Sequence, residues 1–226
     1  MRFDAIIFDF DGVLLESEYE INQLIARLLG ELGHPTTIRE TIEHFTGLSG
    51  RQFVDAVEAR TGCSLPPEFH EQLREAGNRA LIEGIQEVVG AVDFVRSLPS
   101  GLARAVASSS STHWVRTHLE HLGLADAFRD HVYSGKEHVA RGKPAPDLYL
   151  HAASALGVPI ARTAIIEDSK VGATGALASG ATVIGLAAGR HCFDGHADML
   201  RGIGVEHVAR NFEDVAQLLG LDQSSK

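Results

Sequence analysis

The chain has 226 residues, of which 44% are hydrophobic and 22% charged, and its formal net charge is −10. This length suits one α/β domain with a modest insertion. The negative charge argues against a nucleic-acid partner or an anionic membrane, because both require a basic surface. The two cysteines, Cys63 and Cys192, form no CxxC pattern, and no apolar stretch resembles a signal peptide or a membrane span. We therefore expect a cytoplasmic protein without disulfides.

The first predicted element is a strand at residues 3–8, an apolar run that stops at acidic residues and Gly12. Residues 15–86 then show only helical patterns. Ser17 and Glu20 have the spacing of a helix capping box. The apolar residues that follow recur at helical spacing and predict the buried stripe of a helix: Ile21, Leu24, Ile25, Leu28, Leu29 and Leu32.

Three further helices are predicted in this segment, at about 37–45, 50–61 and 67–83. The first two have cap pairs: Thr37 with Glu40, and Ser49 with Gln52. After residue 90 helices and strands alternate. Helices are predicted at 91–98, 112–122, 146–157 and 171–179, and strands at 103–107, 132–133, 164–166 and 182–186.

This alternation predicts a parallel sheet with helices on both faces. The simplest architecture is an α/β fold with a doubly wound, Rossmann-like core and an inserted all-helical cap domain. Residues 1–14 and 87–226 would form the core, and residues 15–86 the cap. In such sheets ligands bind beyond the carboxyl ends of the strands, so catalytic residues should follow the strands directly.

Polar residues do follow the predicted strands. Asp9 and Asp11 follow the first strand, a run of serines from Ser108 follows the strand at 103–107, and Glu167 and Asp168 follow the strand at 164–166. Four carboxylates close together would be costly unless a cation neutralised them. Oxygen ligands suit Mg²⁺.

A cation and several hydroxyl groups complete this set. Lys143 precedes a helix in a Gly-Lys-Pro loop. Ser108 could bind a phosphate through its hydroxyl and backbone N–H, with Ser109 and Ser110 beside a helix N-terminus. Each motif alone also fits a simple structural role: a turn for the two aspartates, a helix cap for Ser110 or Ser111, and a surface lysine. Their occurrence in order at successive strand ends favours the catalytic interpretation.

The order of these motifs resembles that of the haloacid dehalogenase superfamily, in its phosphatase branch. The resemblance extends over nearly the whole chain, and the helical insert looks like the small cap of that family. The group most similar is the β-phosphoglucomutase-like one, which includes many sugar-phosphate phosphatases. The motifs that carry the resemblance are Asp9-Phe10-Asp11-Gly12-Val13, Ser108, Gly142-Lys143-Pro144 and Glu167-Asp168-Ser169.

The resemblance implies a role for each matching residue. Asp9 would attack the phosphorus and form an aspartyl-phosphate, and Asp11 would protonate the leaving alcohol and then activate water. Mg²⁺ would be held by the Asp9 carboxylate, the backbone carbonyl of Asp11 and Asp168, with Glu167 ligating directly or through water. The phosphate-binding residues would be Ser108, Ser109, Lys143 and Gly12. Many relatives carry a further acid just after the last motif, which this chain lacks.

Two positions distinguish a phosphatase from a mutase of the resembled group. Ile21 stands where such mutases have a histidine, and Arg51 is displaced by one residue from the mutase arginine. We therefore expect hydrolysis of a small phosphorylated sugar or sugar acid, such as 6-phosphogluconate. Arg51 is either a substrate contact or a solvated helix residue. A β-phosphoglucomutase-type phosphomutase and a catalytically silent binding module are the alternatives.

Two features have no part in this scheme. A loop carries five potential metal ligands, but their spacing matches no usual zinc template and indicates a surface loop: His191, Cys192, Asp194, His196 and Asp198. None of the 12 histidines stands at a position that the mechanism requires. The expected partner is a small phosphate ester, with no nucleic acid or membrane, and the expected state is a monomer or weak homodimer.

Overall fold

The computed structural model describes residues 3–46, 48 and 50–221. Their strands form one six-stranded parallel sheet in the order β3-β2-β1-β4-β5-β6. The strands are β1 (Ala5–Phe8), β2 (Ala103–Ser108), β3 (Val132–Ser134), β4 (Thr163–Glu167), β5 (Thr182–Leu186) and β6 (His207–Ala209). The order reverses at β1, so the crevice beyond the ends of β1, β2 and β4 is the expected ligand site.

Helices cover both faces of this sheet, because alternate strand residues point to opposite sides. Phe8 of β1 packs with helices on one face, whereas Ile7 packs with helices on the other. The helices on the Phe8 face are α5 (Ala91–Ser97), α6 (Thr112–His121), α7 (Ala125–Phe128) and α11 (Phe212–Leu219). Those on the Ile7 face are α8 (Asp147–Ala155), α9 (Lys170–Ser179) and α10 (His196–Gly202), with the short 3-10 helix η1 (Ile160–Arg162) nearby.

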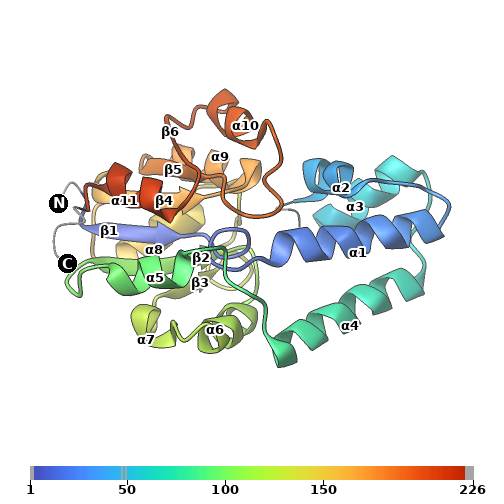
Figure 1. Ribbon diagram of the computed structural model, residues 1–226, viewed down its shortest axis with the longest axis horizontal. Coiled ribbons are helices and arrows are strands. Elements are labelled where there is room, and N and C mark those ends of the chain that lie inside the picture. The colour runs from blue at the N-terminus through green and yellow to red at the C-terminus, as the bar shows by residue number, and fades with distance from the viewer. Residues whose placement is uncertain (1–2, 47, 49, 222–226) are drawn as a thin grey trace.

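The inserted helices form a cap beyond the carboxyl end of β1 (Figure 1). They are α1 (Ser17–Glu31), α2 (Ile38–Phe45), α3 (Gly50–Thr61) and α4 (Pro67–Glu83). Five residues of the predicted α1 stripe belong to the cap core, where Leu28 and Leu29 pack against Phe45 and Phe69, whereas the sixth, Leu32, follows the helix and is exposed. The two segments that join cap and core pair with each other: the Glu16 N–H donates to the Gln86 carbonyl at 2.9 Å.

The α/β class, the helical insertion and the parallel sheet are confirmed, and the predicted elements are present with ends shifted by at most two residues. The capping box at Thr37 and Glu40 is also confirmed. The one at Ser17 is wrong: Glu16 occupies the N-cap position, no side chain caps α1, and Ser17 is already helical. The cap predicted at Ser49 lies outside the described residues.

Five elements of the structure have no counterpart in the predictions, namely α7, η1, β6, α10 and α11. The strand β6 is only three residues long, and its partner β5 lies some twenty residues earlier, so no local pattern announces it. In the part of the chain that the structure describes, no helix has both the length and the apolar character to cross a membrane.

Candidate active site

The carboxyl ends of β1 and β4 bring four acidic residues together. These strands pair in parallel with Phe8 opposite Ile166, so Asp9 and Glu167 end neighbouring strands at the same level. The Asp9 N–H donates to the Ile166 carbonyl at 2.9 Å, which extends the ladder into the site. Register alone therefore places residues more than 150 positions apart in one cluster.

Lys143 lies between two of these acids. Its Nζ is 2.7 Å from Asp9 Oδ1 and 2.6 Å from Glu167 Oε1. All three side chains are buried. The Tyr149 hydroxyl of α8 donates a further hydrogen bond to Glu167 Oε1 at 2.6 Å. A buried charge without a partner is strongly destabilising, so Lys143 lowers the cost of burying both carboxylates.

Burial and neighbouring charges separate the pKa values of this cluster. Burial raises the pKa of Asp9 well above its ordinary value, and the Glu167 charge raises it further, although Lys143 opposes both. Burial would also raise the pKa of Glu167, but Lys143 and the hydrogen bonds from Tyr149 and Ser169 lower it overall. For Lys143, burial favours the neutral form, yet the charges of Asp9 and Glu167 raise its pKa. One cation thus stabilises Glu167 fully and Asp9 only in part.

Asp168 carries the clearest sign of a cation-binding site. Its side chain is 1% exposed, and neither carboxylate oxygen accepts a hydrogen bond from any described residue. Burial, followed by the Glu167 charge, raises its pKa well above the ordinary value. Carboxylate oxygens of Asp9, Glu167 and Asp168 all lie within 4.8 Å of one another. An oxygen-only cluster with unpaired oxygens fits Mg²⁺.

Gly12 allows Asp168 to approach the first loop closely. Its φ is +82°, a left-handed conformation that other residues rarely adopt. A Cβ at this position would overlap with Asp168 Oδ2 and touch the ring of His191. Gly12 is therefore required by the acidic cluster as well as by the turn.

Asp11 has very different surroundings, because hydroxyl and indole groups hold its carboxylate. Oδ1 accepts hydrogen bonds from Ser17 Oγ at 2.8 Å and Trp114 Nε1 at 3.0 Å. Oδ2 accepts from Ser110 Oγ at 2.7 Å and Ser108 Oγ at 3.4 Å. Four neutral donors from α1, α6 and the loop after β2 thus orient this carboxylate.

The serine loop after β2 divides into separate roles. Ser111 caps α6, because its Oγ accepts a hydrogen bond from the Trp114 N–H. The sequence had predicted such a helix cap for either Ser110 or Ser111. Ser110 instead donates to Asp11. The Ser110 N–H in turn donates to Ser108 Oγ at 2.9 Å, which fixes the loop.

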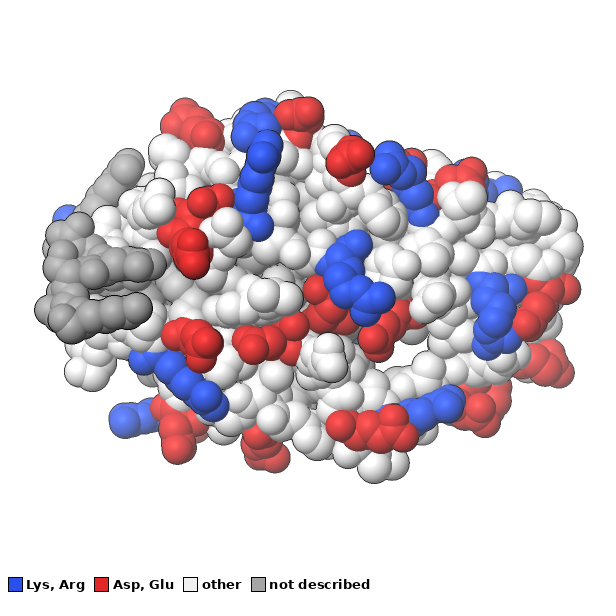
Figure 2. Space-filling view, in the orientation of Figure 1, with Lys and Arg blue, Asp and Glu red and all other residues white. Residues whose placement is uncertain are grey.

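A cavity of about 400 Å³ lies between this cluster and the cap. The predicted residues Asp9, Asp11, Ser108, Ser109 and Lys143 line its core side. Figure 2 shows that the surface opens between α1 and α4, two helices that contribute to the lining. The apolar residues on the cap side are Ile21, Leu24, Ile25, Phe45, Leu48, Phe53, Leu73, Ala76, Ala80 and Ile85.

Arg51 does not line this cavity. Its side chain is 84% exposed and pairs with Asp55 at 2.7 Å on the outer surface of α3. The structure shows no contact from Arg51 to the acidic cluster, and its role in substrate binding stays a prediction.

Several side chains at the site have no counterpart in the predicted set. Trp114 bonds Asp11, and Glu18 lines the cavity, where burial raises its pKa to about 8. His191 is fully buried, with Nε2 2.8 Å from Asp168 Oδ2. No spacing rule links these residues to the motifs, because they come from other elements. The only hint was that Trp114 and His191 each follow a predicted strand by a few residues.

Comparison with known proteins gives the same picture. Residues 6–186 match the family model described as haloacid dehalogenase-like hydrolase. A solved structure of a conserved haloacid dehalogenase-like protein of unknown function from Agrobacterium tumefaciens str. C58 superposes with a TM-score of 0.86 and 34% identity, over 96% of this chain and 98% of that one.

Two relatives from Escherichia coli (strain K12) have named substrates. The chain is 25% identical to 6-phosphogluconate phosphatase over 191 residues, which is 84% of this chain and 85% of the relative. It is 28% identical to a fructose-1-phosphate phosphatase over 179 residues, 79% of this chain and 94% of the relative. The resemblance predicted from the motifs is therefore confirmed.

Proposed function

Because the chain belongs to the haloacid dehalogenase-like hydrolase family and is a phosphatase of that family, we propose that it hydrolyses the phosphate ester of a small, uncharged sugar with Mg²⁺, through an aspartyl-phosphate on Asp9. The observation that carries this proposal is the position of Asp9. Its carboxylate lines the cavity and is paired with the buried Lys143. The nucleophile, its counter-ion and the space for a substrate are thus in one place.

In the first step a carboxylate oxygen of Asp9 forms a bond to phosphorus, and the bond from phosphorus to the leaving oxygen breaks. Asp11 supplies the proton that the leaving oxygen takes. In the second step Asp11 removes a proton from water, whose oxygen attacks the aspartyl-phosphate and releases phosphate and free Asp9. Lys143 and the Ser108 hydroxyl neutralise and orient the phosphoryl oxygens, as phosphoryl transfer requires.

The metal has a ready set of ligands. Carboxylate oxygens of Asp9 and Asp168 and the backbone carbonyl of Asp11 would hold Mg²⁺, and Glu167 would complete or shape the set. Bound there, Mg²⁺ would neutralise the negative charge that builds up between phosphate and carboxylate. The unpaired oxygens of Asp168 support this assignment.

Asp11 must exchange partners during the reaction. The hydrogen bonds from Ser17, Ser110 and Trp114 hold its carboxylate in place. To act as an acid, this carboxyl must take up a proton and turn toward the leaving oxygen. Ser17 belongs to the cap helix α1, so movement of the cap would loosen one of these bonds.

The cap side of the cavity supports hydrolysis of the phosphate ester of an uncharged sugar. Its described lining contains no histidine, lysine or arginine, so it offers neither the mutase histidine nor a partner for a substrate carboxylate. Glu20 there would repel a sugar acid. Asn22 Oδ1 is buried and has no partner among the described residues, so it is an acceptor for a substrate hydroxyl. These features favour the phosphate ester of a neutral sugar over 6-phosphogluconate.

The test is a panel of phosphate esters at fixed Mg²⁺, with free phosphate as readout. We expect fructose 1-phosphate to be hydrolysed with a kcat/KM at least about tenfold higher than 6-phosphogluconate, since each unpaired buried charge costs more than 1.4 kcal/mol. Asp9→Asn should reduce turnover by roughly 10⁴-fold or more, as loss of a nucleophile does in other enzymes.

The matched control is Asp55→Asn, which alters an exposed acid on α3 that does not line the cavity. Normal turnover by the Asp9 variant would refute the mechanism. Faster hydrolysis of 6-phosphogluconate would refute the substrate class alone. Conversion of a sugar 1-phosphate into a 6-phosphate would point to the mutase, and inactivity across the panel to a silent binding module.

A further inference from the structure

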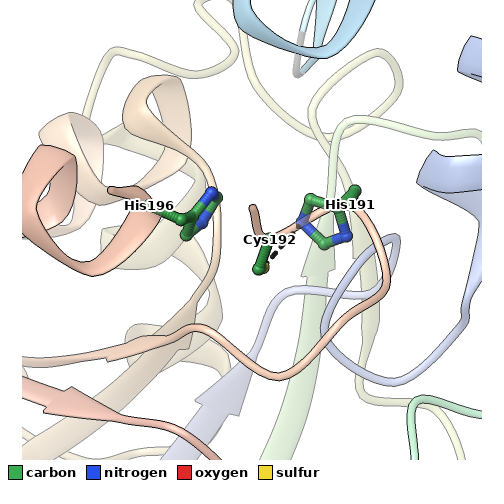
Figure 3. Close-up of side chains that lie close together, drawn as sticks. All are labelled: His191, Cys192 and His196. Carbon is green, nitrogen blue, oxygen red and sulfur yellow. Dashed lines mark hydrogen bonds between the residues drawn. The ribbon is translucent and has the colours of Figure 1, made fainter. Parts of the chain in front are cut away.

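A second cluster of metal-ligand side chains lies just behind the acidic site, in the loop between β5 and α10. His191, Cys192 and His196 each offer a ligand atom, and these atoms lie within 4.8 Å of one another (Figure 3). His191 Nε2 is 3.4 Å from Cys192 Sγ. From zinc bond lengths, ligand atoms in a tetrahedral site lie about 3.4–3.8 Å apart, so a small rotation of side chains would suffice.

One of the two histidines is already held as metal ligands usually are, and the other has a nitrogen without a partner. His196 Nε2 lies 2.7 Å from the Asp168 backbone carbonyl and donates to it, which leaves Nδ1 with a free lone pair. A ligating histidine commonly fixes its second nitrogen on such a carbonyl. Nδ1 of His191 has no hydrogen-bond partner within the described ranges, so it can carry the ring proton when Nε2 binds a metal.

A fourth ligand is close by. Asp168 Oδ2 is 2.8 Å from His191 Nε2, is buried and accepts no hydrogen bond from the residues described here. A cation bound to Nε2 would therefore also meet this oxygen. The set would be two imidazoles, one thiolate and one carboxylate, whereas the first site offers oxygen alone.

We propose that His191, Cys192 and His196, with Asp168 Oδ2, form a binding site for a thiophilic divalent cation such as Zn²⁺. Nitrogen and sulfur ligands select zinc over magnesium. Cys192 and His196 are partly exposed, so the ion has a path from solvent. The thiol loses one proton to solvent when the metal–sulfur bond forms.

Such a site would inhibit the enzyme, an inference that rests on the proposed function. A carboxylate that is shared between two cations offers each of them only part of its charge. Zn²⁺ on the nitrogen and sulfur side would draw this carboxylate away from Mg²⁺. The phosphatase would then lose activity when free zinc rises, although Mg²⁺ remains abundant.

Binding is tested with Co²⁺ as a spectroscopic probe on the metal-free full chain. A cobalt–thiolate bond gives an intense near-ultraviolet absorption that carboxylate ligands do not produce. We expect this band in the wild type and in Cys63→Ser, the control at the other cysteine, which is exposed. Cys192→Ser should lose the band and bind Zn²⁺ at least about tenfold more weakly. Loss of a residue that only hydrogen-bonds a metal ligand already weakens metal binding by about tenfold or more.

The Asp9→Asn variant separates the two sites, because it weakens the oxygen cluster and leaves the nitrogen and sulfur ligands intact. It should retain the band. Absence of the band in the wild type, or its survival in Cys192→Ser, would overturn the site, and neither result depends on phosphatase activity.

Inhibition is measured by adding Zn²⁺ at constant Mg²⁺ with p-nitrophenyl phosphate. Cys192→Ser should keep the Mg²⁺-dependent rate and resist zinc at concentrations at least about tenfold higher than the wild type. Equal inhibition of both would show that zinc acts at the oxygen cluster, and would overturn the shared role of Asp168. A protein with the cobalt band but no hydrolysis of any ester would retain the metal site and refute the proposed function.

Discussion

The core side and the cap side of the cavity are built from opposite materials. On the core side Asp9, Lys143 and Glu167 form a buried chain of charges at the ends of neighbouring strands. On the cap side most of the lining is aliphatic or aromatic, and the acids Glu18 and Glu20 come from a single helix. Charges need a rigid frame, because a buried ion that loses its partner is costly, and paired strands supply that frame.

This contrast assigns catalysis and the choice of substrate to different parts of the chain. The strand ends hold the groups that every phosphate ester needs. The cap supplies shape and a few hydrogen-bond acceptors, which decide what may be attached to the phosphate. Variants on the core side should therefore affect every substrate alike, whereas variants on the cap side should affect some substrates more than others.

The largest effect is expected from Lys143→Met, which keeps most of the side-chain volume and removes the charge. Asp9 and Glu167 would then share a buried site without a cation, which costs about 3–5 kcal/mol. The metal-free variant should unfold at a lower denaturant concentration, and turnover should fall for all substrates. Lys136→Met, at an exposed position, is the control. If the stability of the Lys143 variant were unchanged, the charges on the core side of the cavity would not depend on their pairing, and the contrast with the cap side would fail.

Mg²⁺ should stabilise the protein by neutralising the same carboxylates. At a hundredfold excess over its Kd the gain is about 2.7 kcal/mol, seen as a rise in Tm. Asp168→Asn should lose most of this gain, and because it removes a buried carboxylate with a raised pKa, it should be more stable than the wild type without metal. If the Tm of the wild type did not change on addition of Mg²⁺, the oxygen cluster would be refuted as a metal site.

A smaller effect is expected from Trp114→Phe, which removes one donor to Asp11 and keeps an aromatic ring. A hydrogen bond to a charged group is worth about 1.5–3 kcal/mol, so kcat should fall by roughly tenfold or more while KM changes little. Trp114 is the sole tryptophan of the chain and lines the cavity. Its fluorescence in the wild type should therefore change when a substrate analogue binds.

The smallest effect concerns Glu18 and the pH dependence of stability. Burial raises the pKa of Glu18 from its ordinary value of 4.5 to about 8. The folded protein then keeps this proton while the unfolded chain loses it, so Glu18 reduces stability progressively as pH rises from about 4.5 to about 8. Glu18→Gln lacks this loss of stability. Its free energy of unfolding, measured in urea without metal, should exceed that of the wild type by more at pH 8 than at pH 5. Glu20→Gln, at an exposed position, should show no such difference.

Local patterns were sufficient for the elements that are long or strongly patterned. The strand before Asp9, the apolar stripe of α1 and the capping box at Thr37 depend on residues within one turn or one strand, so the sequence predicts them correctly. The motif residues were found because parallel strands bring their carboxyl ends to one edge. The bounds proposed for the two domains and the roles proposed for the motif residues remain predictions.

Ser17 shows where local reasoning fails. Its spacing to Glu20 is that of a capping box, but its hydroxyl donates to Asp11 instead. The pattern could not reveal this, because the competing acceptor comes from the loop that joins cap to core. Trp114 and His191 are similar cases, since each contacts an acid from a different strand end.

By itself the sequence determined the fold class, the helical insert and the identity of the residues at the strand ends, because these depend on periodicity and chain order. Tertiary structure alone decided the partners of each acid. Lys143 meets Asp9 and Glu167, and neutral donors meet Asp11. Hydrogen bonds and ion pairs act over about 3 Å, a distance at which only the packed chain sets which side chains are neighbours.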